Sequence, residues 1–321
     1  MFSLIVPVYK NRESLSALLI VLQKINEKMK TLEVVFVVDG SPDESYLFLK
    51  THLISQPFQS QLILLSRNFG SFAAIRAGLE SATGNFFAVM AADMQDPPEL
   101  IVEFFEALKS DEADVTLGIR KGRSDPLMSR IFSTIFWSCY RHFIQKDMPP
   151  GGIDVFGCNR LFLDQLISLN ESNSSLIGLL FWLGFRRKFI PYVRLPRKHG
   201  KSAWSFRRKL KYLSDSLFSF SDLPIRILIL FGIFGVLFSV GFGFFAFLAK
   251  IYNWVRIPGY TTTLLITLFF TGFNSLGFGI IGSYIWRAFE NSKARPQTVI
   301  MRKESFKGQL HELFCTSSRY M

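Results

Sequence analysis

The sequence predicts a doubly wound α/β domain with a mostly parallel sheet, followed by a hairpin of two membrane-spanning helices. Three observations lead to this prediction. Short runs rich in β-branched residues alternate with segments of helical apolar period, turn residues follow the strands, and two long uncharged stretches lie near the C-terminus.

The alternation starts at the N-terminus. Residues 3–9 form a short apolar run closed by polar residues, which is typical of a buried parallel strand. A helix follows, because apolar residues recur at three- and four-residue steps from Leu15 to Ile25. The next expected elements are strands at 33–38, 61–65 and 85–90 and a helix at 72–81. After Gly118 the alternation of strand and helix patterns becomes less regular. Sheets of this kind bind ligands beyond the carboxyl ends of their strands.

Composition excludes several classes of protein. The chain has 321 residues, a formal net charge of +12, 49% hydrophobic residues and a mean hydropathy of +0.25, which excludes a disordered chain and a coiled coil. Its three cysteines, Cys139, Cys158 and Cys315, have neither the spacing of a disulfide framework nor that of a zinc site. The N-terminus lacks the basic region and cleavage site of a signal peptide, so we expect the bulk of the protein in the cytoplasm.

Two uncharged stretches predict the membrane hairpin. Residues 227–249 would extend about 34 Å as a helix, enough to cross a bilayer, and residues 257–286 form the second stretch. Cations are concentrated outside the hairpin, which places both flanks in the cytoplasm. The dense cations of residues 186–211 would suit nucleic acid, but their position beside a span favours a phosphate or lipid headgroup. The mixed segment 205–220 fits either an interfacial helix or a core-facing one.

Polar residues at the strand ends predict the site. Asp93, Gln95 and Asp96 follow a strand and precede two prolines, an arrangement that would hold oxygen ligands outward for Mg²⁺ or Mn²⁺. Asp39 follows the neighbouring strand and Arg67 the third one, so all face one crevice. Together they would hold a nucleoside diphosphate.

Four stretches carry a family resemblance: LIVPVYKNRESL, VVFVVDGSPDES, LLSRNFGSFAAIRAGLESATGN and ADMQDPPEL. As a set they resemble glycosyltransferase family 2, in particular its polyisoprenyl-phosphate glycosyltransferases, the group of dolichol-phosphate mannose synthase. The resemblance implies a GT-A (nucleotide-diphospho-sugar transferase) fold, a nucleotide-sugar donor, a divalent metal and a polyisoprenyl-phosphate acceptor. It implies inverting sugar transfer at the cytosolic face of the inner membrane, giving a lipid-phosphate-sugar for cell-envelope glycosylation.

The resemblance also implies roles for individual residues. On the donor side, nucleotide-sugar contacts are expected from Pro7, Tyr9, Glu13, Asp39, Arg67 and Asp93, and metal ligation from Asp93 and Gln95. On the acceptor side, lipid-phosphate contacts are expected from Arg120, Arg123, Lys201, Ser202 and Arg208. The catalytic residues expected are Asp93, Asp154 and Arg123.

With the resemblance, the expected organisation is a multi-pass membrane protein with both termini in the cytoplasm. The expected segments are a GT-A catalytic domain at 1–202, an interfacial amphipathic segment at 203–223, membrane helices at 224–250 and 262–287 joined by an extracytoplasmic loop at 251–261, and a cytosolic tail at 288–321. The number of subunits stays open, and a homo-oligomer is compatible with the sequence.

Two departures from the family pattern bear on function. Ala91 stands where many relatives have an acidic residue, and Asn11-Arg12 replaces the usual Asn-Glu-Glu run after the tyrosine. Ala91 favours one alternative, a catalytically weak, membrane-anchored protein that binds nucleotide-sugar or lipid phosphate. A processive polysaccharide synthase fits less well, because its Q-x-x-R-W motif and additional spans do not occur, and a dehydrogenase would need G-x-G-x-x-G after the first strand. The sugar, the nucleotide and the lipid length stay open.

Overall fold

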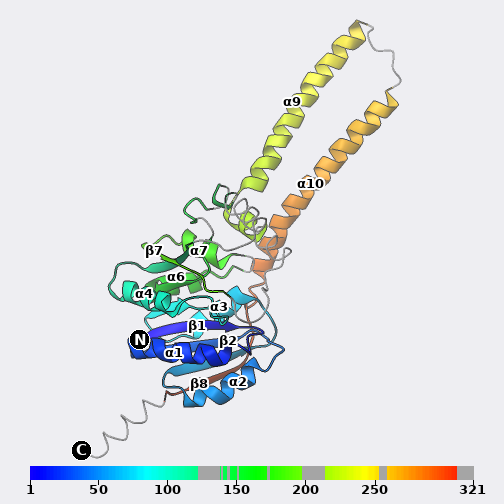
Figure 1. Cartoon of the computed structure of the whole chain (residues 1–321). Coiled ribbons are helices and arrows are strands. Elements are labelled where there is room, and N and C mark those ends of the chain that lie inside the picture. The colour runs from blue at the N-terminus through cyan, green and yellow to red at the C-terminus, as the bar shows by residue number, and fades with distance from the viewer. Residues whose placement is uncertain are drawn as a thin grey trace, which may run out of the picture.

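The computed structural model describes residues 1–121, 138, 140–142, 145–149, 152–171, 174–196, 214–252 and 259–308. An α/β domain lies at one end of the molecule, and two long helices extend away from it (Figure 1). The predicted GT-A-like architecture, with its mostly parallel sheet, is confirmed.

The sheet has eight strands in the order β7-β5-β6-β4-β1-β2-β3-β8. The first four strands in sequence are parallel, β5 and β7 are also a parallel pair, and β6 and β8 run antiparallel to their neighbours. The strands are β1 (Phe2–Val8), β2 (Leu32–Val38), β3 (Gln59–Leu65), β4 (Phe86–Val89), β5 (Val115–Arg120), β6 (Phe156–Asn159), β7 (Arg187–Tyr192) and β8 (Ile300–Phe306).

Helices cover both faces of the sheet. The helices of the domain are α1 (Leu15–Met29), α2 (Ser45–His52), the 3-10 turn η1 (Leu53–Ser55), α3 (Ser71–Ser81), α4 (Pro98–Lys109), α6 (Arg160–Ser168) and α7 (Leu176–Trp182). One core joins α1, α2 and α4 to one face, and a second core joins α3, α6 and α7 to the other. Alternate residues of β1 serve the two cores, Leu4 and Val6 the first and Ile5 the second. The four predicted strands and two predicted helices of the N-terminal part are confirmed.

Pro7 lies inside the central strand β1, where a proline is unusual. The register explains why it is tolerated. β4 pairs with β1 only as far as Ile5, whose carbonyl accepts a hydrogen bond from Met90 N at 3.0 Å. The side on which Pro7 lacks its N–H is therefore beyond the end of β4.

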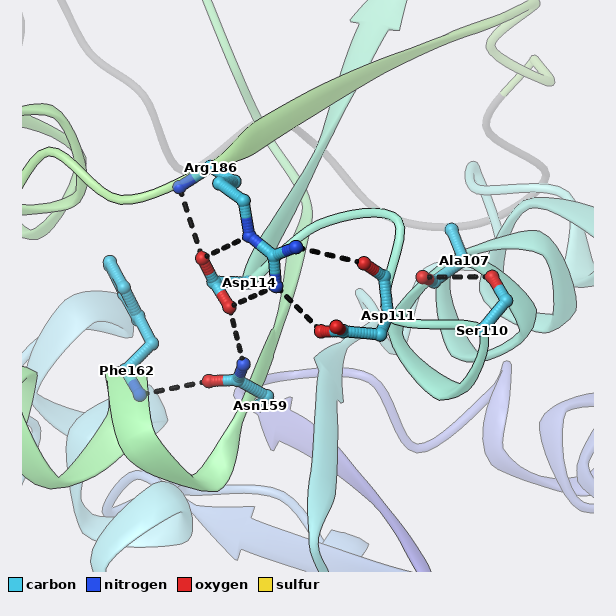
Figure 2. A network of polar contacts seen from close by, with 7 residues as sticks. All are labelled: Ala107, Ser110, Asp111, Asp114, Asn159, Phe162 and Arg186. Atoms are coloured by element: carbon cyan, nitrogen blue, oxygen red, sulfur yellow. Dashed lines mark hydrogen bonds and ion pairs between the residues drawn. The ribbon is translucent and has the colours of Figure 1, made fainter.

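A charged network fastens the start of β5 to β6 and β7 (Figure 2). The Asp114 carboxylate, in a residue only 8% exposed, accepts hydrogen bonds from Arg186 Nε at 3.1 Å and Asn159 Nδ2 at 2.9 Å. Asn159 also caps α6, because its Oδ1 accepts from Phe162 N at 2.9 Å. These bonds lower the pKa of Asp114, with Arg186 as the largest cause. The network lies at the edge of the sheet opposite the candidate site.

The long helices are α9 (Leu223–Ile251) and α10 (Tyr260–Ser292), which cover the two predicted membrane helices. Among the described residues, one helix is long and apolar enough to cross a membrane: Leu223–Phe242, with a mean hydropathy of 2.4 and none of it buried. α10 does not meet that criterion, so the predicted pair of membrane helices is supported for one member only.

Residues 214–220 are helical and lie between the domain and α10. Gly178 of α7 makes room for the ring of Phe220, since a Cβ there would lie 2.4 Å from it. On the other side, Asp215 Oδ1 lies 2.8 Å from Arg287 Nη2 of α10. Ser216 is fully buried, so this part of the predicted interfacial segment packs against protein.

Strand β8 lies in the predicted cytosolic tail, residues 288–321, in which the sequence predicted no helix or strand. It pairs antiparallel with β3, from Ser60 opposite Phe306 to Leu65 opposite Ile300. Its residues, IMRKESF, carry three consecutive charges and little apolar alternation, which is why no strand was expected there. The chain that leaves the domain along α9 therefore returns to the same sheet after α10.

Candidate active site

The candidate site lies along the carboxyl ends of the parallel strands, where the sequence placed it. The loops after β1 and β2 are tied together first. Lys10 N donates to Ser41 Oγ at 2.8 Å, and Ser41 Oγ donates to Asp43 Oδ1 at 2.6 Å. Arg12 N donates to the other oxygen of Asp43 at 3.1 Å. Burial would raise the pKa of Asp43, but these hydrogen bonds outweigh it and lower that pKa.

Asp39 ties the β2 loop to the loop after β3. It is 2% exposed, and its carboxylate accepts hydrogen bonds from Phe69 N at 2.7 Å and Gly70 N at 2.9 Å. Gly40 has a φ of +55°, and a Cβ there would lie 2.3 Å from the carbonyl carbon of Arg67. A glycine is therefore needed where the two loops meet.

The other donor-side residues predicted from the sequence lie around these loops. The guanidinium of Arg67 stacks over the Phe69 ring at 4.0 Å, Tyr9 and Pro7 are half-buried, and Glu13 is exposed. The structure thus brings Pro7, Tyr9, Asp39 and Arg67 to one edge of the sheet. Their contacts with a nucleotide stay a prediction.

The loop after β4 carries the predicted metal ligands. Asp93 Oδ1 accepts a hydrogen bond from Gln95 N at 3.3 Å, and Met94 between them has a φ of +58°. Gln95 pairs with Leu195 through two bonds, from Leu195 N to Gln95 O at 2.9 Å and from Gln95 Nε2 to Leu195 O at 3.2 Å. The amide nitrogen is thus turned to Leu195, so Oε1 is the atom with which Gln95 could bind a cation.

Asp93 and Gln95 could provide two oxygen ligands for a divalent metal. In the part of the chain that the structure describes, no three His, Cys, Asp or Glu side chains group together so as to hold a metal ion. One carboxylate and one amide oxygen nevertheless fit Mg²⁺ or Mn²⁺, which usually bind one or two carboxylates and complete the shell with water and phosphate oxygens.

Asp96 differs from the expectation that it points outward. It is 2% exposed, its Oδ2 accepts from Ala91 N at 3.2 Å, and its Oδ1 accepts from the Tyr192 hydroxyl at 3.5 Å. Burial is the main cause that raises its pKa. A carboxyl group turned into the domain holds the loop in shape and is not available as an outward ligand.

The acceptor-side residues of the described chain form an ion pair. Arg120 ends β5, Asp154 precedes the antiparallel strand β6, and their side chains pair, with 18% and 39% of the side chains exposed. Both strand ends lie at the edge that carries Asp93, because β6 starts where β5 finishes. Arg123, Lys201, Ser202 and Arg208 lie outside the described residues.

The sequence did not single out Tyr192, and it offered Arg194 only as one member of the cation run 186–211 that was expected to meet a phosphate. Tyr192 ends β7 directly beside Arg120, and Arg194 acts electrostatically on both Asp96 and Tyr192. The dense cations from Arg186 onward indicated a phosphate site in this region. Because no strand was predicted there, neither residue could be placed relative to Asp93 or Arg120.

Comparison with known proteins supports membership of glycosyltransferase family 2. The glycosyl transferase family 2 model matches residues 3–168, which is more than half of the chain. The chain belongs to this family. It is 31% identical over 304 residues to the putative glycosyltransferase CsbB of Bacillus subtilis (strain 168), covering 94% of this chain and 91% of that protein.

A second relative agrees with this assignment, and one solved structure with a similar chain is reported beside it. The family 2 chain is 29% identical to the prophage bactoprenol glucosyl transferase homolog of Escherichia coli (strain K12), covering 94% of this chain and 98% of that one. Among solved structures, it resembles S. aureus TarS 1-349 in complex with UDP-GlcNAc, with a TM-score of 0.47, 18% identity, and coverage of 68% of this chain and 67% of that one.

Proposed function

We propose that this family 2 protein transfers a sugar, with inversion at the anomeric carbon, from a nucleotide-sugar to an undecaprenyl-type polyisoprenyl phosphate. The observation that carries the proposal is that the loop of Asp93 and Gln95 and the ion pair of Arg120 with Asp154 lie at one edge of the sheet. A donor site and an acceptor site must meet in this way for direct transfer. The name of the bactoprenol relative supports the acceptor class, since bactoprenol is a polyisoprenyl alcohol.

The cofactor of the proposed reaction is Mg²⁺ or Mn²⁺, held by Asp93 and Gln95. When bound, it would supply positive charge to the diphosphate that leaves with the nucleotide. The nucleotide itself would lie over Pro7 near the end of β1 and over Tyr9 and Glu13 in the segment that follows, with Asp39 and Arg67 beyond them. The order already imposed on these loops by Ser41, Asp39 and Asp43 supports a preformed nucleotide site.

The chemistry follows from the charge of the acceptor. A phosphate monoester has a second pKa of about 6, so at neutral pH it is mostly a dianion and a competent nucleophile. One of its oxygens forms a bond to the anomeric carbon while the bond from that carbon to the diphosphate oxygen breaks, and the nucleoside diphosphate leaves. No proton has to be removed, so Asp154 would position Arg120 and the acceptor. Arg123, Lys201, Ser202 and Arg208 would complete the acceptor-phosphate site.

The proposed setting is the cytosolic face of the inner membrane, with α9 and α10 as a membrane hairpin. Both helices expose many large apolar side chains, among them Phe234 and Phe238 on α9 and Phe269 and Phe278 on α10. Strand β8 adds an argument from connectivity. Because β1 and β8 belong to one sheet, a chain that crosses the bilayer along α9 must cross back before Ile300, and α10 is the described element long enough to do so.

The test uses the purified full chain in detergent with undecaprenyl phosphate, a panel of radiolabelled nucleotide-sugars, and Mg²⁺ or Mn²⁺ present or chelated. We expect one donor to label the lipid, with the product of inverted anomeric configuration. Labelling should fall by about 100-fold or more in Asp93→Ala, because transition-state charge stabilisation is lost. Asp164→Ala serves as the matched control, since that carboxylate lies on the outer surface of α6 with 58% of its side chain exposed.

Two results would contradict the proposal. A product that keeps the donor's anomeric configuration would exclude direct displacement. Nucleotide binding without labelling by any donor would favour the non-catalytic binding protein, and would make Ala91 the residue to explain.

A further inference from the structure

Tyr192 and Arg120 are cross-strand neighbours. β5 and β7 are parallel and pair in register from Val115 opposite Arg187 to Arg120 opposite Tyr192. Lys121 N then donates to Tyr192 O at 2.7 Å, which closes the ladder. Gly118 leaves space for the tyrosine ring, because a Cβ there would lie 3.1 Å from Tyr192 Cε1. The two side chains therefore lie beside each other at the end of the strands.

A chain of polar contacts runs through these two residues. It starts at the loop of the predicted metal ligands, where Asp96 accepts from Ala91 N at 3.2 Å and from the Tyr192 hydroxyl at 3.5 Å. The guanidinium of Arg120, the cross-strand neighbour of Tyr192, interacts favourably with the phenol oxygen. The same guanidinium pairs with Asp154. The chain thus joins the donor side of the site to the acceptor side.

We propose that Tyr192 is a positioning residue for the acceptor: its hydroxyl, anchored on buried Asp96, turns the Arg120 guanidinium toward Asp154 and the phosphate of the polyisoprenyl acceptor. This inference rests on the proposed function. A guanidinium has five donors in a rigid fork, so its orientation decides whether it meets a phosphate with two parallel bonds or with one. Tyr192 acts on the guanidinium from one side and Asp154 pairs with it on the other, so the two together fix the direction in which it meets the phosphate.

The protonation of Tyr192 is consistent with this role. Burial is the main cause that raises the pKa of the phenol, so at neutral pH the hydroxyl keeps the proton that it donates to Asp96. Its oxygen stays available as the acceptor for Arg120. The ring is 5% exposed and packs in the core of the domain, and phenylalanine would retain that packing. The hydroxyl can therefore be removed without opening a cavity.

The experiment compares Tyr192→Phe with wild type in the transfer assay. We expect the KM for undecaprenyl phosphate to rise about fivefold to tenfold, while the KM for the donor stays within about twofold. Tyr46→Phe is the matched control, because it removes a hydroxyl of similar burial that bonds Glu304 at the other end of the sheet. In the Arg120→Ala background the effect of Tyr192→Phe should vanish, since no guanidinium is left to orient. If the hydroxyl had only a structural role, Tyr192→Phe would still change the acceptor KM in that background.

Binding of farnesyl phosphate without donor, measured by calorimetry, separates this inference from the proposed function. Wild type that binds farnesyl phosphate but transfers no sugar would refute the transferase. The inference would then stand if Tyr192→Phe binds farnesyl phosphate about fivefold or more weakly than wild type, and would be overturned if the two bind equally. Tyr192→Phe that binds and reacts like wild type would overturn the inference and leave the transferase intact. An equal rise in the KM for the donor would also overturn it, because the role assigned to Tyr192 concerns the acceptor. Wild type that neither binds nor transfers would refute both.

Discussion

The carboxylate of Glu304 on β8 lies 2.8 Å from Nζ of Lys50 on α2. The same carboxylate accepts a hydrogen bond from the Tyr46 hydroxyl at 2.5 Å. These contacts fasten the segment after α10 to the first half of the domain. Strand β8 also covers the edge of β3, which would otherwise present unpaired backbone groups.

Removal of residues 300–321 should therefore destabilise the α/β domain. We expect the melting temperature of the detergent-purified protein to fall by about 5 °C or more, and aggregation to increase, because a buried strand becomes an edge. Glu304→Gln should have a smaller effect, since an amide oxygen can still accept from Tyr46. A truncated protein that melts like the full chain would show that β8 does not contribute to the stability of the domain.

The Asp114 network predicts a second stability effect. Asp114→Ala leaves Arg186, Asn159 and a backbone N–H without their shared acceptor, and we expect a loss of about 2 kcal/mol in the free energy of unfolding. Asp111→Ala is the control, because the Asp111 side chain is 80% exposed and its ion pair with Arg186 is screened by solvent. Urea unfolding of both variants measures the difference, and equal values would assign the stabilisation to the exposed pair.

Glu33 predicts how stability depends on pH. Burial would raise its pKa, but hydrogen bonds from Ser3, Thr83 and Gln61 outweigh burial, so the pKa of Glu33 lies below its ordinary value of 4.5. The stabilisation is present above the unfolded-state pKa and is lost as the pH falls through the lower, folded-state pKa.

Melting temperature measured from pH 7 to pH 3 tests this sign. Wild type should lose stability more steeply below about pH 4.5 than Glu33→Gln, which should already be less stable at pH 7 by about 2 kcal/mol. Glu27→Gln, at an exposed position of α1, should follow wild type. Parallel curves for wild type and Glu33→Gln would remove Glu33 as the cause of the acid sensitivity.

The first four strands could be predicted because each is a short apolar run buried on both faces. The later strands could not. β6 consists of FGCN and β7 of RKFIPY, whose glycine, proline and cations resemble a loop in any local window. Their pairing with β4 and β5 holds them in the sheet, and that long-range information is invisible to periodicity.

The residues of the candidate site likewise fall into those that the sequence could predict and those that it could not. Asp39 and Asp93 could be predicted because they directly follow recognisable strands, and strand ends meet at one edge of a parallel sheet. Tyr192 could not, because its position depends on the register of β5 with β7. The inward turn of Asp96 was also out of reach, since it depends on Ala91 N and on Tyr192.

Gly40 lies where the loops after β2 and β3 meet, at the proposed donor site. In Gly40→Ala, the new Cβ would lie 2.3 Å from the Arg67 carbonyl carbon and 2.5 Å from Asn68 N, so backbone atoms of the β3 loop would have to move. That movement would pull Phe69 N and Gly70 N away from the carboxylate of Asp39. We expect the Kd for the nucleoside diphosphate to rise about tenfold or more, since a loop displaced by an ångström loses its preorganised contacts.

Gly70→Ala is the matched control for this prediction. Gly70 also has a positive φ, of +102°, but a Cβ there would meet nothing within 4 Å. This variant carries the backbone strain of an alanine at a positive φ without the collision. Calorimetric titration of both variants with the nucleoside diphosphate distinguishes the two causes. A large loss in Gly40→Ala alone would assign donor affinity to the contact between the Asp39 and Arg67 loops, whereas equal losses would assign it to backbone strain and contradict the prediction.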